Sequence, residues 1–130
     1  MNDKNLDKHT DKNTSLFNIN YKKFTGKVVN ILSGNKIRVI INIDNNYLKF
    51  NVILNRTLDQ NIIGSKNRLY NLITNDDEIE NIYFILNNKN YLVNLSTYYF
   101  DKDGNIVADV YKNGTLLSDI LINEKFLKSI

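Results

Sequence analysis

Apolar and polar residues alternate along three consecutive segments in the first half of the chain. The alternation is clearest in residues 36–43, where the odd positions are apolar and the even positions, apart from Ile40, are polar. Residues 24–32 are rich in aliphatic side chains, and residues 47–54 alternate again. A period of two is typical of half-buried strands. With short polar turns at 33–35 and 44–46, the pattern predicts three strands in an antiparallel meander.

A helical pattern follows in the middle of the chain. Residues 55–74 are mostly polar and predict an exposed loop with some local structure. Asn75 has Glu78 three residues later, as in a capping box, and the acidic residues between 76 and 80 suit the positive end of a helix dipole. We therefore expect a helix that begins at Asn75, and we attribute the acidic cluster to that helix end rather than to a metal site.

Two further strands and a second helix complete the pattern. Residues 91–100 are rich in aromatic and β-branched side chains, and residues 106–111 alternate after a polar turn. Residues 115–130 return to helical spacing after Asn113-Gly114, a strong turn signal. The order β-β-β-α-β-β-α predicts an α+β protein of the OB-fold class, a five-stranded antiparallel barrel with about two helices.

The first 20 residues differ from the rest in composition. They contain few apolar residues and many Asn, Asp and Lys, so we expect residues 1–20 to be a disordered tail and residues 21–130 to form the domain. The single histidine, His9, lies in this tail, where we expect it to be inert. There is neither the apolar stretch of a signal peptide nor a membrane-spanning run. These features predict an intracellular protein with no membrane partner, either cytoplasmic or virion-associated.

The amino-acid composition excludes several kinds of catalytic and structural site. The chain of 130 residues fits one domain. The absence of cysteine excludes disulfide scaffolds, thiolate metal sites and cysteine nucleophiles, and a single histidine in the tail excludes a serine-hydrolase triad. The net charge of +3 gives only weak electrostatic support for nucleic-acid binding. The counts of 24 Asn and 17 Ile against a single Ala indicate an A/T-rich genome.

Four segments resemble, in order, the signatures of staphylococcal-type nucleases. In residues 29–37 a hydrophobic strand runs through Ser33-Gly34-Asn35 into a second strand, where the family has Asp-Gly-Asp-Thr. Residues 48–57 resemble the family strand that ends in Asp-Thr-Pro-Glu. Residues 100–111 and 111–121 resemble its Asp-Lys-Tyr-Gly-Arg segment and its Tyr-x-Asp-Gly helix entry. The resemblance covers about residues 24–128 and implies the OB barrel of these nucleases.

The same resemblance implies that the nuclease chemistry is lost. Family members hold calcium with carboxylates and stabilise the pentacoordinate phosphate with arginines. Their metal-side carboxylates fall here on Ser33, Asn35 and Arg56. Their catalytic arginines fall on Asn51 and Asn105, and the general-base glutamate falls near Asp59. Because a hard cation needs several charged oxygen ligands, we expect no bound metal, no cofactor and no catalysis.

One other run has metal-like spacing. Asp101, Asp103 and Asn105 mimic the start of an EF-hand loop. The sixth position of that loop should be Gly and the twelfth Glu, but they are Ile106 and Lys112. We therefore interpret the run as a turn.

Basic and aromatic residues indicate a nucleic-acid surface. OB barrels bind single strands through a basic groove and aromatic platforms. The candidate contacts lie on or near the outer side of the first three strands and at the family's phosphate-contacting lysine: Lys36, Arg38, Lys49, Arg56 and Lys102. Tyr98 and Tyr99 are candidates for base stacking. The alternative is a solvated lysine face with tyrosines in the core or at its rim.

Three functions stay open at this stage. The first is a catalytically inactive nuclease-like module that binds DNA or RNA, with Arg56 meeting a phosphate where the family binds metal. The second is a structural or protein-interaction protein, such as a self-associating viral component. The third is a metal-dependent nuclease with a site rebuilt around Asp59, Asp101 or Asp103.

Overall fold

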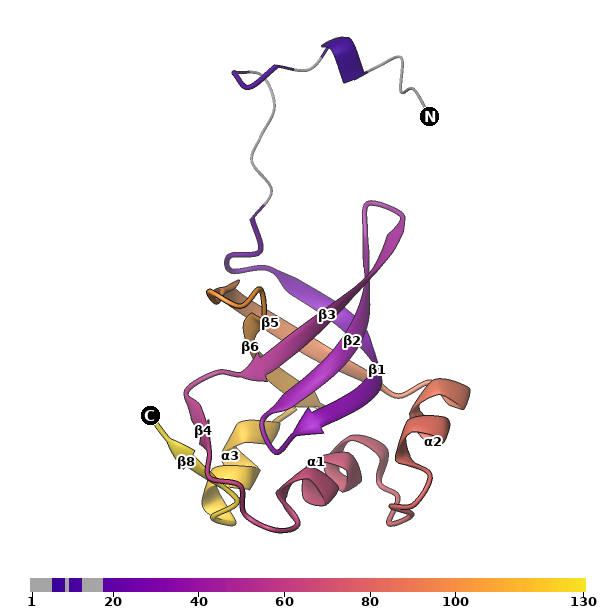
Figure 1. Cartoon of the computed structure of the whole chain (residues 1–130), viewed down its shortest axis with the longest axis vertical. Coiled ribbons are helices and arrows are strands. Elements are labelled where there is room, and N and C mark those ends of the chain that lie inside the picture. Colours follow the sequence, from indigo (N-terminus) through magenta and orange to yellow (C-terminus); the bar gives the residue numbers. More distant parts are fainter. Residues whose placement is uncertain (1–5, 9, 13–17) are drawn as a thin grey trace.

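Five strands form a closed barrel in the computed structural model, which describes residues 6–8, 10–12 and 18–130 (Figure 1). The barrel strands are β1 (Lys23–Ser33), β2 (Lys36–Ile43), β3 (Asn46–Leu54), β5 (Leu92–Phe100) and β6 (Ile106–Lys112). Strand β1 pairs with β2 and β5, and β6 pairs with β5 and β3. This is the OB-like α+β barrel that the sequence predicts.

One pairing differs from the expected antiparallel barrel. Strands β3 and β6 run parallel, with Val52, Ile53 and Leu54 opposite Ile106, Val107 and Ala108. The reason is one of parity, because a closed ring with an odd number of strands cannot alternate direction at every neighbour. The barrel is therefore mixed.

Alternation along the strands fills the barrel interior. In β2 the apolar positions Ile37, Val39 and Ile41 are at most 1% exposed, as the period of two predicts. The other strands contribute the remaining core residues, among them Val28, Ile31, Val52, Leu54, Val93, Leu95, Ile106 and Val110, and β1 does so across shifts in its register with β2. The hairpin between β2 and β3 turns on Asp44 and Asn45, whose φ angles are 52° and 67°, as a two-residue type I′ loop requires.

The segment between β3 and β5 differs most from expectation. Where we expected a loop, the chain forms β4 (Thr57–Asp59) and α1 (Ser65–Thr74). Where we expected a helix to begin, Asn75 instead ends α1: it has φ 58° and donates its N–H to the Asn71 carbonyl. The prediction of a helix from Asn75 was wrong because a left-handed Asn is also a favoured helix C-cap. The next helix is α2 (Ile82–Asn88).

The C-terminal helix is shorter than the predicted 115–130. After β7 (Thr115–Leu116), α3 (Leu117–Asn123) ends where Lys125 adopts φ 66° and Phe126 N–H bonds the Leu121 carbonyl. This is a Schellman-type ending, which turns the chain out of the helix. The chain then forms β8 (Leu127–Ser129), which pairs antiparallel with β4.

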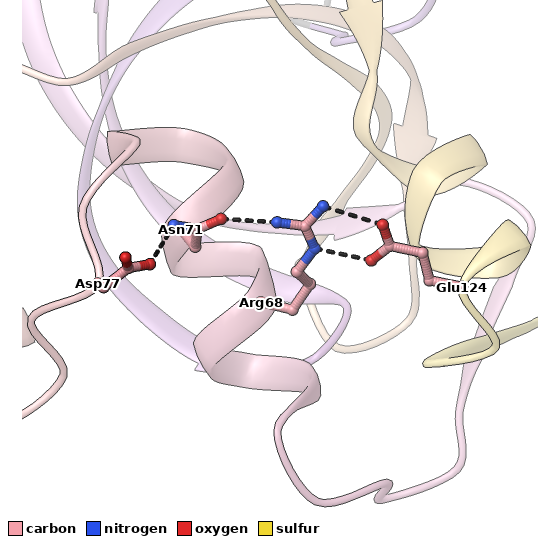
Figure 2. Close-up of polar contacts among 4 residues, drawn as sticks. All are labelled: Arg68, Asn71, Asp77 and Glu124. Carbon is pink, nitrogen blue, oxygen red and sulfur yellow. Dashed lines mark hydrogen bonds and ion pairs between the residues drawn. The ribbon is translucent and has the colours of Figure 1, made fainter.

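The three helices gather at one end of the barrel, and the β2–β3 hairpin projects from the other (Figure 1). A polar network ties α1 to the end of α3 (Figure 2). Arg68 donates from Nε and Nη2 to the two Glu124 carboxylate oxygens, at 2.7 and 2.9 Å, and from Nη1 to Asn71 Oδ1. Asn71 in turn donates to Asp77 Oδ1 at 2.8 Å. The bond from Arg68 holds the pKa of Glu124 below its usual value.

Ile19, two residues before the predicted boundary between tail and domain, is fully buried in the barrel core. The short 3-10 helix η1 (Leu6–Lys8) lies in the preceding segment. Residues 1–5, 9 and 13–17, which include His9 and most of the predicted tail, lie outside the described residues. No helix in the described part of the chain is long and apolar enough to cross a membrane.

Thr97 fastens the N-terminal segment to β5. Its hydroxyl donates to the Ile19 carbonyl and accepts from the Lys22 N–H at 3.0 Å. Its backbone N–H donates to the Lys22 carbonyl, and its backbone carbonyl accepts the Tyr21 N–H. Thr97 is 2% exposed, which makes these hydroxyl bonds costly to lose.

Replacing Thr97 with Val is expected to lower the free energy of unfolding by about 1.5 kcal/mol, because the near-isosteric side chain fills the space without the hydroxyl bonds. Urea unfolding measures the change. Thr25→Val, on β1 with an exposed hydroxyl bond to Asn94, is the matched control. If Thr97→Val lowers the free energy of unfolding by no more than Thr25→Val does, the result would contradict a stabilising role for the Thr97 hydroxyl bonds.

Candidate ligand-binding face

The β2–β3 register gathers basic side chains on the outside of the barrel. Arg38 lies opposite Asn51, and Lys49 lies opposite Ile40, the residue two positions along from Arg38. Lys36 lies two positions from Arg38 in the other direction. Because side chains two residues apart share a sheet face, Lys36, Arg38 and Lys49 share the outer face. The predicted basic residues of these two strands therefore lie together.

Arg38 is held by its cross-strand neighbour. Its Nε donates to Asn51 Oδ1 at 2.9 Å. This bond uses one of the five guanidinium donors and leaves both Nη groups to other acceptors. Asn51 occupies the position that the nuclease resemblance gives to a catalytic arginine. A guanidinium is thus present beside that position, carried by the adjacent strand.

A pocket of about 350 Å³ lies beside Arg38. Its walls come from β2, β3 and the β5–β6 loop: Arg38, Lys49, Phe50, Asn51, Asp103, Gly104 and Asn105. Two cations and two amides face one acidic side chain here. Chemically, this lining is suited to an anionic ligand with several hydrogen-bond acceptors, such as a phosphodiester.

Asp101 shapes the loop that closes this pocket. Its Oδ1 accepts the N–H groups of Asp103 and Asn105, both at 2.9 Å, and its Oδ2 accepts from Asn105 Nδ2 at 3.1 Å. Burial of the carboxyl opposes its ionisation, but these bonds and the charge of Lys36 outweigh it and lower the pKa of Asp101. The run Asp101-x-Asp103-x-Asn105 is therefore a hydrogen-bonded turn, with Gly104 at φ 80°.

The lowered pKa of Asp101 predicts a pH effect on stability. A carboxyl whose pKa is depressed by folding contributes stability above its unfolded value of about 3.9 and loses it as the pH falls through the folded value. Asp101→Asn should therefore lose less stability than the wild type as the pH falls from about 5 to about 3. Urea unfolding across this range measures the difference. Parallel pH curves for the two proteins would show that Asp101 makes no such contribution.

Ser33 and Asn35, where the nuclease resemblance places two metal ligands, belong to a neutral cluster. Ser33 Oγ donates to Asn35 Oδ1 at 3.0 Å, and Asn35 Nδ2 donates to Thr57 Oγ1 at 3.3 Å. Asp59, the nearest acid in the predicted site, accepts the Asn61 N–H at 2.9 Å. Across the described residues, no group of three or more His, Cys, Asp or Glu side chains could hold a metal ion.

Arg56, which precedes Thr57, lines a pocket that does not include this cluster. Its φ is 57°, and it lines a second pocket, of about 340 Å³, with Tyr98, Asp109 and residues of α3. Tyr98 donates to Asp109 Oδ2 at 2.6 Å, and this bond, with burial, raises the pKa of the phenol. Arg56 and Tyr98 are thus neighbours in one pocket, away from the pocket lined by Arg38 and Lys49.

Two further predicted contacts are exposed. Lys102 is exposed on the β5–β6 loop, and Tyr99 is 53% exposed on β5. Sequence reasoning missed Tyr47, which is 76% exposed and shares a sheet face with Lys49 and Asn51. It also missed Phe50 and Phe100, whose ring centroids lie 6.0 Å apart. The alternation along 47–54 was the signal that could have identified Tyr47.

Comparison with known proteins adds no relative. No family model matches the chain, and no curated protein matches its sequence.

Proposed function

We propose that this domain is a catalytically inactive, nuclease-like OB-fold module that binds single-stranded DNA or RNA within the cell. The observation that carries the proposal is the pocket beside Arg38, in which two cations from β2 and β3 and the amides of Asn51 and Asn105 outnumber one acid, Asp103. The outer face of these two strands and the β5–β6 loop form the surface on which OB barrels generally bind oligonucleotides. Exposed Tyr47 and Tyr99 beside this face can stack with bases.

Arg38 would act as the main phosphate ligand. Its Nε is fixed by Asn51, so its Nη groups can meet a phosphate with less ordering cost than a free lysine. Lys49, Lys36 and Lys102 would add backbone contacts that carry no sequence information. We do not assign this role to Arg56, because its pocket sets one cation against two acids, Asp109 and Asp119, whereas the pocket beside Arg38 has two cations and one acid.

A nuclease rebuilt around Asp59, Asp101 or Asp103 has less support. Both Asp101 oxygens accept bonds within their own loop, and Asp59 Oδ1 accepts from Asn61. Among the described residues, these carboxylates do not gather into a group of three that could hold a metal ion. We therefore expect no cleavage of a single-stranded substrate with added Ca²⁺ or Mg²⁺. Cleavage that EDTA abolishes would favour the rebuilt nuclease instead.

Chemical-shift mapping tests where the ligand binds. A short single-stranded oligonucleotide is titrated into the ¹⁵N-labelled protein. We expect the largest amide shifts in residues 36–51 and 101–105, and small shifts in α2 and β8. Shifts confined to the surroundings of Arg56 and Tyr98 would move the site to the second pocket, and an unchanged spectrum would remove the proposal.

A further inference from the structure

Helix α2 presents aromatic side chains to solvent. Tyr83 is 64% exposed and Phe84 is 66% exposed, although the same helix buries Leu86 completely in the core. Asn87 Nδ2 also donates to the Val29 carbonyl of β1 at 3.0 Å, which fixes the orientation of the helix. Two adjacent rings held outward on a packed helix make an apolar surface of the kind that marks interaction sites. Ile79, 50% exposed just before the helix, lies next to them in sequence.

Acidic residues precede these rings along the chain. Four acidic residues lie between 76 and 80, directly before α2: Asp76, Asp77, Glu78 and Glu80. The whole chain has a net charge of +3, so without these four it would have +7. The α2 surface, defined here as residues 76–84, is therefore acidic and aromatic on a protein that is otherwise strongly basic. Charge complementarity selects a basic partner with apolar side chains among its cations.

The β2–β3 hairpin of the same chain is such a partner, because it carries cations and exposed apolar side chains. It projects from the end of the barrel opposite the helices (Figure 1). Arg38 and Lys49 lie on its outer face, with Tyr47 76% exposed and Leu48 43% exposed towards its tip. Because the hairpin and the α2 surface belong to different elements, one molecule can offer both surfaces to two neighbours at once.

We propose that the β2–β3 hairpin of one copy docks on the α2 surface of a second copy. The aromatic side chains would pack together while Arg38 and Lys49 face Glu78 and Glu80. Such a head-to-tail contact is heterologous, so it extends into chains or closes into a ring rather than stopping at a symmetric dimer. The inference does not depend on nucleic-acid binding. If both hold, they compete for Arg38 and Lys49, and a single strand disperses the assembly.

Charge exchange tests the contact by sedimentation velocity, without nucleic acid. At about 50 mM salt, where surface charges are weakly screened, the mean mass of the wild type should rise above 15.2 kDa with concentration. Glu78→Lys/Glu80→Lys alone and Arg38→Glu/Lys49→Glu alone should stay monomeric, because the first neutralises the acidic α2 surface and the second places acidic residues on both surfaces. An equimolar mixture of the two variants should associate again. A wild type that stays monomeric at every concentration, or a mixture that does not associate, overturns the inference.

A second pair of substitutions separates the aromatic contribution from charge. Tyr83→Ser/Phe84→Ser keeps every charge and removes only side chains that are exposed, so the fold is maintained. We expect at least a tenfold weaker association. Association equal to that of the wild type would show that the rings take no part and would overturn the docking as proposed.

Discussion

Replacing Arg38 and Lys49 together by alanine is expected to weaken binding of a single-stranded oligonucleotide about 30-fold at about 0.1 M salt. The two cations line the same pocket, and each lost phosphate contact at a partly exposed site is worth about 1 kcal/mol. Fluorescence anisotropy with a labelled oligonucleotide measures the change. Because both side chains lie on the outside of the barrel, the melting temperature should change by no more than about 3 °C.

Lys66→Ala/Lys89→Ala is the matched control for this double variant. Both lysines are exposed, on α1 and at the end of α2, and their loss changes the net charge by the same two units. We expect this control to weaken binding by less than about threefold, because it acts only through the overall field. Equal losses in the two double variants would mean that net charge, and not the pocket, attracts the strand.

Replacing Gly34 with Ala is expected to destabilise the domain by about 2 kcal/mol, because the added methyl group overpacks a closed corner. A Cβ at Gly34 would lie 2.5 Å from Ser65 Oγ and 2.9 Å from Ser65 Cβ, closer than real contacts allow. Ser65 is 4% exposed at the start of α1 and has little room to move. Urea unfolding measures the loss.

A double-mutant cycle with Ser65→Gly isolates this clash. The second substitution removes both atoms that the new methyl group meets, so Gly34→Ala should cost less in the Ser65→Gly background than alone. Additive losses would show that the cost of Gly34→Ala arises elsewhere. The clash matters for function as well, because it shows that α1 closes the corner where the resemblance places a metal site.

The barrel could be predicted because its strands have one buried face. The alternation of apolar residues gives the bounds of β2 at Lys36–Ile43 directly, since any other assignment would expose Ile37 and Ile41. The helix boundaries were harder to predict than those of the strands. An Asn followed by acidic residues suits a helix start, yet Asn75 can also adopt the left-handed conformation that ends α1, and packing of Leu69 and Ile73 decides between the two.

The sequence predicts which residues form the candidate site, but it does not predict which of them lie opposite one another on neighbouring strands. The expected turn at 44–46 has three residues, whereas the observed hairpin loop has two, Asp44 and Asn45. A register shifted by one residue would pair Arg38 with the buried Val52 instead of Asn51. The bond that holds Arg38 beside the pocket therefore depends on a turn type that the sequence left undecided.

Salt dependence of single-strand binding, measured in EDTA, tests the central claim most directly. Four cations flank the proposed strand path: Lys36, Arg38, Lys49 and Lys102. At about 0.7 released counterions per phosphate contact, the slope of log K against log salt should lie at about −2 to −3. The affinity should be the same with EDTA as with Ca²⁺. Absence of binding at low salt, a slope near zero, or binding that requires Ca²⁺ would contradict a metal-free phosphate-binding face on this barrel.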